Sequence, residues 1–184
     1  MSGAAATPAP GDQARVTVGV AVPPDEAFRV FTQEVDLWWR RGRRFRHAPG
    51  DDGAQRGVVC IEPGAGGRLF ESFNTGMGEQ VLEIGRTLVW DPPHRLVLQW
   101  RAANFAPHEH TEVEVLFTPS PGGTTVTLVH RGWNAIRTDH PVRHGQDEPA
   151  FIRTMGLWWG DQLTMMRLRA SGQMPSSDPE HSIA

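Results

Sequence analysis

One histidine has a position from which it could take part in chemistry. Between Thr124 and Trp133, His130 shares a face with Val126 and Leu128, because side chains on one face of a strand recur every second residue. An inward imidazole with a near-neutral pKa could act as a general base or orient a bound ligand. It could also be a core histidine that hydrogen-bonds to a neighbouring backbone group or Trp. The alternation predicts the inward direction and leaves these roles open.

Glu71 is the second group with possible acid–base chemistry, on the strand face of Phe73. If this face points inward, a buried carboxylate near Arg68 or His130 would have a shifted pKa and would mark a site. Since Phe70 occupies the opposite face, an outward Glu71 fits the pattern equally well. With His130, an inward Glu71 could supply the acid and base of a pocket enzyme.

Potential metal ligands and the cysteine predict no further site. Four possible ligands alternate along one segment: His108, His110, Glu112 and Glu114. Because side chains alternate between the two faces of a strand, these four lie on the face opposite to Val113. We therefore expect them to face solvent and to bind no metal. Cys60 is the single cysteine, which excludes an intrachain disulfide and a cysteine-based zinc site. The chain has no P-loop, dinucleotide fingerprint or G-x-S-x-G motif, so no cofactor is predicted and no residue is assigned as catalytic.

Aromatic and Met side chains form the most pronounced pattern of the chain. Seven Trp occur in 184 residues, and walls of Met and aromatic groups are typical of pockets for flat apolar molecules. The same stripes could simply fill a core. Gly156 and Gly160 share one helical ridge and should let something approach the helix backbone closely. The predicted pocket residues are Trp38, Trp39, Phe45, Glu71, Leu98, Trp100, Val115, Phe117, Leu128, His130, Trp133, Met155, Gly156, Trp158 and Trp159.

A basic run surrounds Phe45 and consists of Arg40, Arg41, Arg43, Arg44 and Arg46. Such runs can contact phosphates. The formal net charge of −3 nevertheless gives no general attraction to nucleic acid or anionic lipid. We therefore predict a solvated, mobile loop over residues 40–57 that forms the lid or mouth of the pocket. Neither a nucleic-acid nor a membrane partner is predicted.

A sheet and a long helix must position these groups, and the hydrophobic periodicity predicts their order. Residues 16–22 alternate as a half-buried strand, and one or two helices follow to about Trp39. A C-terminal helix begins after the capping residue Asp147. Tight turns between the intervening strands make them antiparallel, so the fold class is α+β. These strands are predicted at 58–62, 67–73, 78–90, 95–101, 111–118 and 124–132.

Length and composition indicate one domain. The chain is 39% hydrophobic and 21% charged, as in ordinary globular proteins. We predict a domain over residues 15–170 between disordered tails at 1–14 and 171–184. No apolar run approaches the roughly 18 to 20 residues that span a bilayer. The N-terminus lacks the basic start and apolar stretch of a signal peptide, so a cytoplasmic protein is expected.

Six local motifs follow one another along the chain. They are VPPDEAF at 22–28, WW at 38–39, EPGAGGR at 62–68, VWDPPHRLVLQW at 89–100, TEVEV at 111–115 and VHRGW at 129–133. In this order they resemble the START-like superfamily, also called SRPBCC, helix-grip or Bet v-like. Within it, residues 15–170 are most similar to bacterial relatives of the C-terminal domain of the activator of the ninety-kilodalton heat-shock protein ATPase. The resemblance implies a curved antiparallel sheet wrapped around a long C-terminal helix.

The resemblance also implies a ligand-binding scaffold without universal catalytic residues, and three functions stay open. The first is binding of a hydrophobic or aromatic small molecule between the sheet and the C-terminal helix. The second is a polyketide cyclase- or hydrolase-like enzyme that uses the same pocket with His130 and Glu71. The third is interaction with a chaperone partner. The ligand, the pathway and the oligomeric state do not follow from the sequence, because one fold serves many functions.

Overall fold

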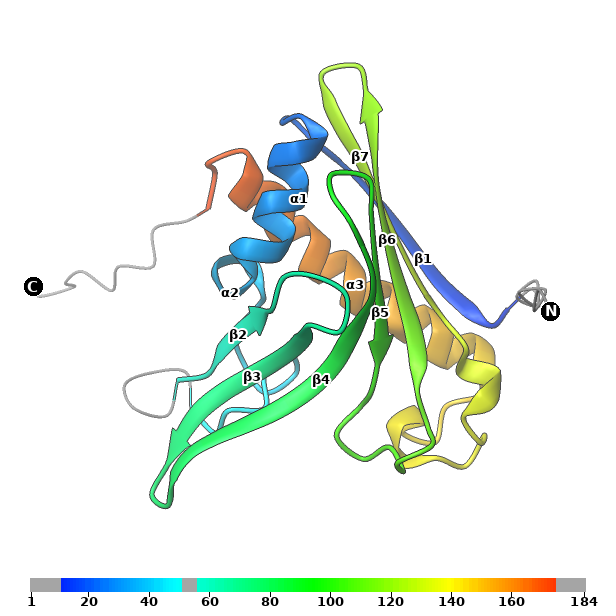
Figure 1. The fold of residues 1–184 in the computed structure, drawn as a ribbon. Helices are drawn as coiled ribbons and strands as arrows, with labels where there is room; N and C mark the ends of the chain where they lie inside the picture. The colour runs from blue at the N-terminus through cyan, green and yellow to red at the C-terminus, as the bar shows by residue number, and fades with distance from the viewer. Residues whose placement is uncertain (1–10, 51–55, 175–184) are drawn as a thin grey trace, which may run out of the picture.

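Seven strands form one antiparallel sheet that curls around a long helix (Figure 1). The computed structural model describes residues 11–50 and 56–174. The strand order is β1-β7-β6-β5-β4-β3-β2, which confirms the predicted α+β helix-grip arrangement. The strands are β1 (Gln13–Val20), β2 (Val58–Ile61), β3 (Arg68–Thr75), β4 (Gly78–Asp91), β5 (Arg95–Trp100), β6 (Thr111–Ser120) and β7 (Gly123–Arg131). The helices are α1 (Pro24–Gln33), α2 (Val35–Trp38) and α3 (Glu148–Ala170), with 3-10 turns at Trp133–Ala135 and Pro141–Arg143.

The sheet bends along β3 and β4. Register shifts occur between Leu69 and Phe70 in β3 and next to Val89 in β4, and such bulges increase the local twist of a strand. Gly85 lets β4 approach β5 closely, because a Cβ at this position would lie 2.4 Å from the backbone oxygen of Gln99. As a result the β3–β4 hairpin projects away from β5, β6 and β7 (Figure 1). It lies beside the loop that follows α2.

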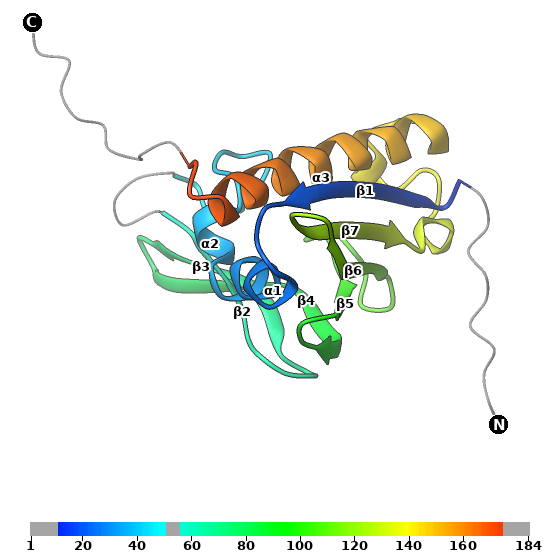
Figure 2. The same cartoon turned by 90° about the horizontal axis from the view of Figure 1, so that it is seen from above.

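Helix α3 lies across the concave face of the sheet, alongside β1 (Figure 2). Its apolar stripe places Leu163 and Met166 in the core, with no exposed surface on either. Helix α1 closes the other end of the core, where the rings of Phe28 and Phe31 lie 5.2 and 5.7 Å from the ring of Phe117. Sheet and helices therefore enclose a large apolar core, and Phe105, Trp133, Ile136 and Phe151 form a second, smaller cluster.

Both ends of α3 are stabilised by side chains, and the cap at the N-terminal end is the predicted one. The Asp147 carboxylate accepts a hydrogen bond from the backbone N–H of Ala150 at 2.9 Å, which satisfies one of the free amides of the first turn. Arg167 and Arg169 in the last turn complement the helix dipole. Although α3 has 23 residues, neither it nor any other helix within 11–50 and 56–174 is apolar enough over a sufficient length to cross a membrane.

Several element boundaries differ from the predicted ones. Strand β1 begins at Gln13, inside the predicted tail, because Gln13 pairs with Arg131 at the end of β7. Strands β6 and β7 run further than predicted, up to the pair Ser120–Gly123. The hairpin can close this tightly because Gly122 adopts a φ of +81°, in the left-handed region. The rest of the two predicted tails, 1–10 and 175–184, lies outside the described residues.

Candidate functional site

His130 lies in the centre of the core and has no exposed surface. The indole N–H of Trp159 donates to its Nδ1 at 3.0 Å, and its Nε2 lies 2.7 Å from the hydroxyl of Thr111. An indole nitrogen can only donate, so Nδ1 must be unprotonated and the ring proton must sit on Nε2, where it is donated to Thr111. Both ring nitrogens are thus occupied by the protein itself.

Electrostatics agree with a neutral imidazole at this position. Burial lowers the pKa of His130 to about 3, because the core cannot solvate an imidazolium. At neutral pH the ring carries no charge, and its one N–H proton and its one nitrogen lone pair are both engaged by Thr111 and Trp159. The sequence left three roles open for His130: general base, ligand-orienting group and core histidine. The geometry matches the third role, with a Trp as a hydrogen-bond partner.

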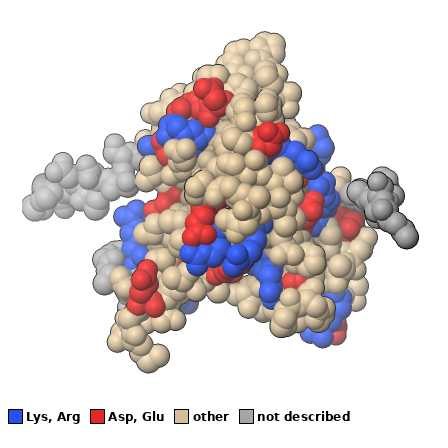
Figure 3. All heavy atoms as spheres, viewed as in Figure 1, with Lys and Arg blue, Asp and Glu red and all other residues tan. Residues whose placement is uncertain are grey.

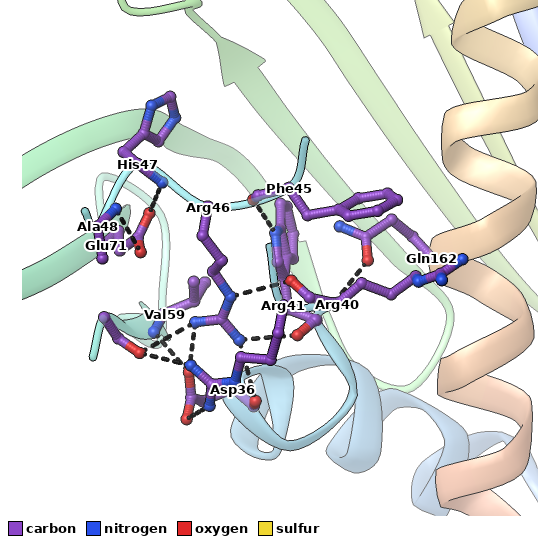
Figure 4. Close-up of polar contacts among 12 residues, drawn as sticks. Asp36, Arg40, Arg41, Phe45, Arg46, His47, Ala48, Val59, Glu71 and Gln162 are labelled. Atoms are coloured by element: carbon purple, nitrogen blue, oxygen red, sulfur yellow. Dashed lines mark hydrogen bonds and ion pairs between the residues drawn. The ribbon is translucent and has the colours of Figure 1, made fainter. Parts of the chain in front are cut away.

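Glu71 points inward and is fully buried, which decides the direction that the sequence left open. Its carboxylate accepts hydrogen bonds from the backbone N–H groups of His47 at 2.7 Å and Ala48 at 3.2 Å (Figure 4). Arg68, considered as its partner, instead forms an ion pair with Glu62 on the half-exposed side of β3. The buried carboxylate therefore fastens the loop after α2 to β3 and leaves no oxygen directed at a substrate.

We expect Glu71→Gln to lower the free energy of unfolding by about 1–3 kcal/mol, since an amide replaces a buried charged acceptor of two N–H groups. Glu83→Gln is the matched control, because Glu83 forms its ion pair with Arg86 on the exposed surface of β4. The free energy of unfolding of Glu83→Gln should fall by less than about 0.5 kcal/mol. Urea denaturation of both variants measures the difference, and equal losses would contradict an anchoring role for Glu71.

Arg46 fastens the same loop at a second point (Figure 4). The sequence predicted it as part of a solvated run; in the structure its side chain is only 1% exposed. The guanidinium donates to the Asp36 carboxylate at 2.6 Å and to the backbone oxygens of Trp39, Arg40 and Gly57 at 2.7, 3.1 and 3.3 Å. Five donors in a planar fork can satisfy this many acceptors, which an ammonium could not.

The partner of Arg46 is held in its ionised form. Burial opposes ionisation of Asp36, but the N–H of Val59 and the guanidinium of Arg46 outweigh it and leave the pKa of Asp36 below its ordinary value. The Val59 N–H donates to this carboxylate at 2.9 Å. Asp36 and Arg46 therefore connect α2, the loop and β2.

Two Trp side chains complete the attachment of the loop to the rest of the domain. Trp39 donates its indole N–H to the backbone oxygen of Phe45 at 2.8 Å, and Trp158 of α3 donates to that of Arg44 at 2.9 Å. The rings of Phe45 and Trp158 stack at a centroid distance of 5.7 Å. The segment predicted to be a mobile lid is thus attached to both the sheet and α3 through its residues 40–50, which are described together with 56–57.

This loop forms one wall of an open pocket of about 280 Å³, which we call the mouth pocket. The other walls come from β4 and β5, the segment after β5, the segment before α3, and α3 itself. The mouth pocket is lined by Trp39, Arg43, Arg44, Phe45, Arg46, His47, Ile84, Trp100, Arg101, Ala102, Ala103, Val142, His144 and Trp158. Its floor is aromatic, with Trp39 and Trp100 nearly parallel at a centroid distance of 6.2 Å.

Below the mouth pocket, the space between sheet and α3 is filled. The Trp100 ring packs edge-on against Trp159 at 5.4 Å and against His130 at 5.6 Å. Of the predicted pocket residues, Trp39, Phe45, Trp100 and Trp158 line the mouth pocket. Those with at most 2% exposure are Trp38, Glu71, Leu98, Val115, Phe117, Leu128, His130, Trp133 and Trp159. Ligand contacts from this buried group stay a prediction, which would require the core to open.

The two glycines of α3 do not bring another element close. A Cβ added at Gly156 or Gly160 would meet no atom within 4 Å outside the nearby helix backbone. The sequence predicted a close approach to this ridge. For the other elements of this protein, that prediction is wrong. Met155 and Gly156 are half-buried, and neither is among the residues that line the mouth pocket.

The outer face of the sheet carries ion pairs. Glu112 and Glu114, considered as metal ligands, pair with Arg131, and Glu114 also pairs with Arg95 at 2.6 Å. Within 11–50 and 56–174, no group of three His, Cys, Asp or Glu is arranged to hold a metal ion. Cys60 is half-buried, and burial raises the pKa of its thiol.

Much of the lining of the mouth pocket has no signal in the sequence. No pattern points to Ile84, Ala102, Ala103 and Val142, because they belong to separate segments without a shared motif. Arg43 and Arg44 were recognised only as members of a basic run. Phe45 was the one loop residue whose place at the pocket was predicted, from its aromatic ring within that run.

One comparison with known proteins identifies the family, and another supports the fold. Residues 21–170 match the family model described as activator of Hsp90 ATPase homolog 1-like protein, whereas no curated protein matches the chain. Among solved structures, a protein of unknown function from Staphylococcus aureus is similar at 14% identity with a TM-score of 0.59, covering 88% of this chain and 96% of its own. The Aha1 dimer from Colwellia psychrerythraea is similar at 12% identity with a TM-score of 0.58, covering 89% and 98%.

A protein from Nitrosomonas europaea is similar at 14% identity with a TM-score of 0.57, covering 89% of this chain and 97% of its own. Identities this low support a shared fold and no shared activity. The family model, however, extends over strands β2 to β7, the loop and α3 together. The chain therefore belongs to the family of activator of Hsp90 ATPase homolog 1-like proteins, within the START-like superfamily.

Proposed function

We propose that the chain binds a small aromatic or apolar molecule in the mouth pocket. The observation that carries this proposal is the set of four aromatic rings, from three separate parts of the chain, which converge on one open cavity. Its volume of about 280 Å³ lies just below the usual range of small-molecule sites, roughly 300–1,000 Å³. A ligand of one or two fused rings suits this space. The superfamily fold commonly binds hydrophobic ligands.

The anchored loop supports this proposal. A binding site that is already formed avoids the entropy cost of ordering its walls when the ligand arrives. Arg46 and Glu71 hold the loop from behind with buried hydrogen bonds, so that Phe45 stays against Trp158. The proposed site is thus lined by rigid aromatic groups rather than by a flexible lid.

An enzyme using the two candidate acid–base groups has less support. His130 has no exposed surface, and both its nitrogens are occupied. Glu71 uses its oxygens on backbone N–H groups of the loop. A general acid or base must come within hydrogen-bond reach of the substrate, and neither group does so from its buried position. We therefore propose binding without a reaction.

A thermal-shift and Trp-fluorescence panel of one- and two-ring compounds tests the proposal. At 100 times its dissociation constant a ligand should stabilise the protein by about 2.7 kcal/mol. Ala103→Trp should fill the pocket and remove this shift, because Ala103 is an exposed lining residue. Asn104→Trp is the matched control, an exposed neighbour outside the lining set. A shift that survives Ala103→Trp, or a panel without any binder, would overturn the proposal.

The second candidate function is interaction with another protein, and the exposed apolar side chains of the β3–β4 hairpin favour it. Met77 at its tip is 93% exposed and Val81 is 52% exposed, and both line a shallow apolar depression together with Phe73. Exposed apolar patches often mark protein contacts. The variant Met77→Glu/Val81→Glu should then lose capture of a purified ninety-kilodalton heat-shock chaperone and keep small-molecule binding. Equal capture of the chaperone by the parent protein and by the variant would argue against a contact through the hairpin.

A further inference from the structure

The rim of the mouth pocket is basic, although the chain as a whole is acidic. Its lining contains Arg43, Arg44, Arg46 and Arg101 together with two His, and neither Asp nor Glu. The formal net charge of the full chain is −3. On the face shown in Figure 3, basic and acidic side chains are mixed, without one continuous patch of either sign. The mouth pocket thus differs in charge from its surroundings.

Not all of these cations are available to a ligand. Arg46 is buried and neutralised by Asp36. Arg44 shares Asp161 with Arg40, at N–O distances of 3.6 and 3.3 Å. Both of these guanidinium groups also lie over the ring of Phe45, 5.5 and 4.9 Å from its centre. These three side chains mainly shape and support the aromatic wall.

Arg43 and Arg101 remain without a carboxylate partner in the part of the chain that the structure describes. Arg43 is exposed, and no hydrogen bond or ion pair joins it to residues within 11–50 and 56–174. Arg101 uses one nitrogen, Nη2, on the backbone oxygens of Ala106 at 2.8 Å and Phe105 at 3.4 Å. Its other N–H groups and the whole guanidinium of Arg43 can still donate.

We propose that the ligand of the mouth pocket carries a carboxylate, which Arg43 and Arg101 bind while its ring lies on the aromatic floor. This inference rests on the proposed function and adds the chemical class of the ligand, an aromatic carboxylate. Guanidinium groups match the planar, two-oxygen geometry of a carboxylate and form charge-assisted hydrogen bonds with it. A local positive potential beside a low-dielectric wall also attracts an anion to the opening.

The test compares 2-naphthoate with 2-naphthamide, which have the same rings and differ in charge. In isothermal titration at low ionic strength, naphthoate should bind at least about tenfold more tightly, as expected for hydrogen bonds to a charged group. The ratio should shrink as salt is raised. In Arg43→Gln, naphthoate should lose most of this advantage while naphthamide binds unchanged.

Arg153→Gln provides the matched control, because Arg153 is an exposed arginine of α3 outside the lining set. It removes the same charge and should leave both affinities unchanged. Equal binding of the two compounds would overturn the carboxylate inference and leave the proposed function standing. Equal losses in Arg43→Gln and Arg153→Gln would also overturn it, since only the net charge would then matter. Binding of neither compound, with no other binder in the panel, would overturn both proposals.

Discussion

Replacing Arg46 with Met lowers the free energy of unfolding by about 3–5 kcal/mol, the cost of removing one member of a buried ion pair. The Asp36 carboxylate, 20% exposed, then keeps its charge with Arg41 at 3.0 Å as its remaining cation. The backbone oxygens of Trp39 and Arg40 lose this donor at the same time, whereas that of Gly57 keeps the guanidinium of Arg41 at 2.7 Å. Urea denaturation followed by far-ultraviolet circular dichroism measures the loss.

Arg44→Met is the control for this variant, two positions along the same loop. The Arg44 side chain is 56% exposed and lies 3.6 Å from Asp161, and exposed pairs of this kind contribute roughly 0–1 kcal/mol. Similar stabilities of Arg46→Met and Arg44→Met would show that the buried network does not hold the loop.

The second large effect is a loss of stability in mild acid caused by His130. Its pKa in the folded protein is about 3, against an ordinary value of 6.5. As the pH falls below 6.5, the unfolded chain binds a proton that the folded protein cannot, so the contribution of His130 is complete above pH 6.5 and declines down to about pH 3. The decline approaches roughly 1.4 kcal/mol per pH unit within this window.

Denaturation of the protein and of His130→Phe at several values between pH 7 and 4.5 isolates this contribution. The variant should be less stable at pH 7, since the indole N–H of Trp159 and the hydroxyl of Thr111 lose their partner. Its stability should nevertheless fall less steeply with acid than that of the parent. Parallel pH profiles of the two proteins would show that His130 does not titrate in this way.

Hydrophobic periodicity and the short turns were sufficient to predict the α+β class, whereas the curvature of the sheet around α3 was implied by the family resemblance. Alternation along 124–132 placed His130 inward, as the structure confirms. Strand ends were predicted less well, because an end depends on the partner strand. The start of β1 at Gln13 follows from its pairing with Arg131, more than a hundred positions away in the chain.

The state of each polar candidate could not be read from local pattern. Whether Glu71 faces inward depends on how β3 pairs with β2 and β4, and its partners lie in a loop 23 and 24 positions earlier. Arg46 appears as one of several similar arginines in the sequence. It differs from the others because its side chain is buried, where the Asp36 carboxylate and four backbone oxygens surround it in space.

The sequence by itself determined the class of fold, the inward faces of its strands and helix, and the supply of aromatic rings and arginines for a site. Only the tertiary structure decided where that site lies, because the rings of Trp100 and Trp159 meet in the core and leave the open space at its mouth. The physical reason is that hydrophobic periodicity shows only which face of a single strand or helix is buried. Packing of large side chains and pairing of charges depend on several elements meeting in space.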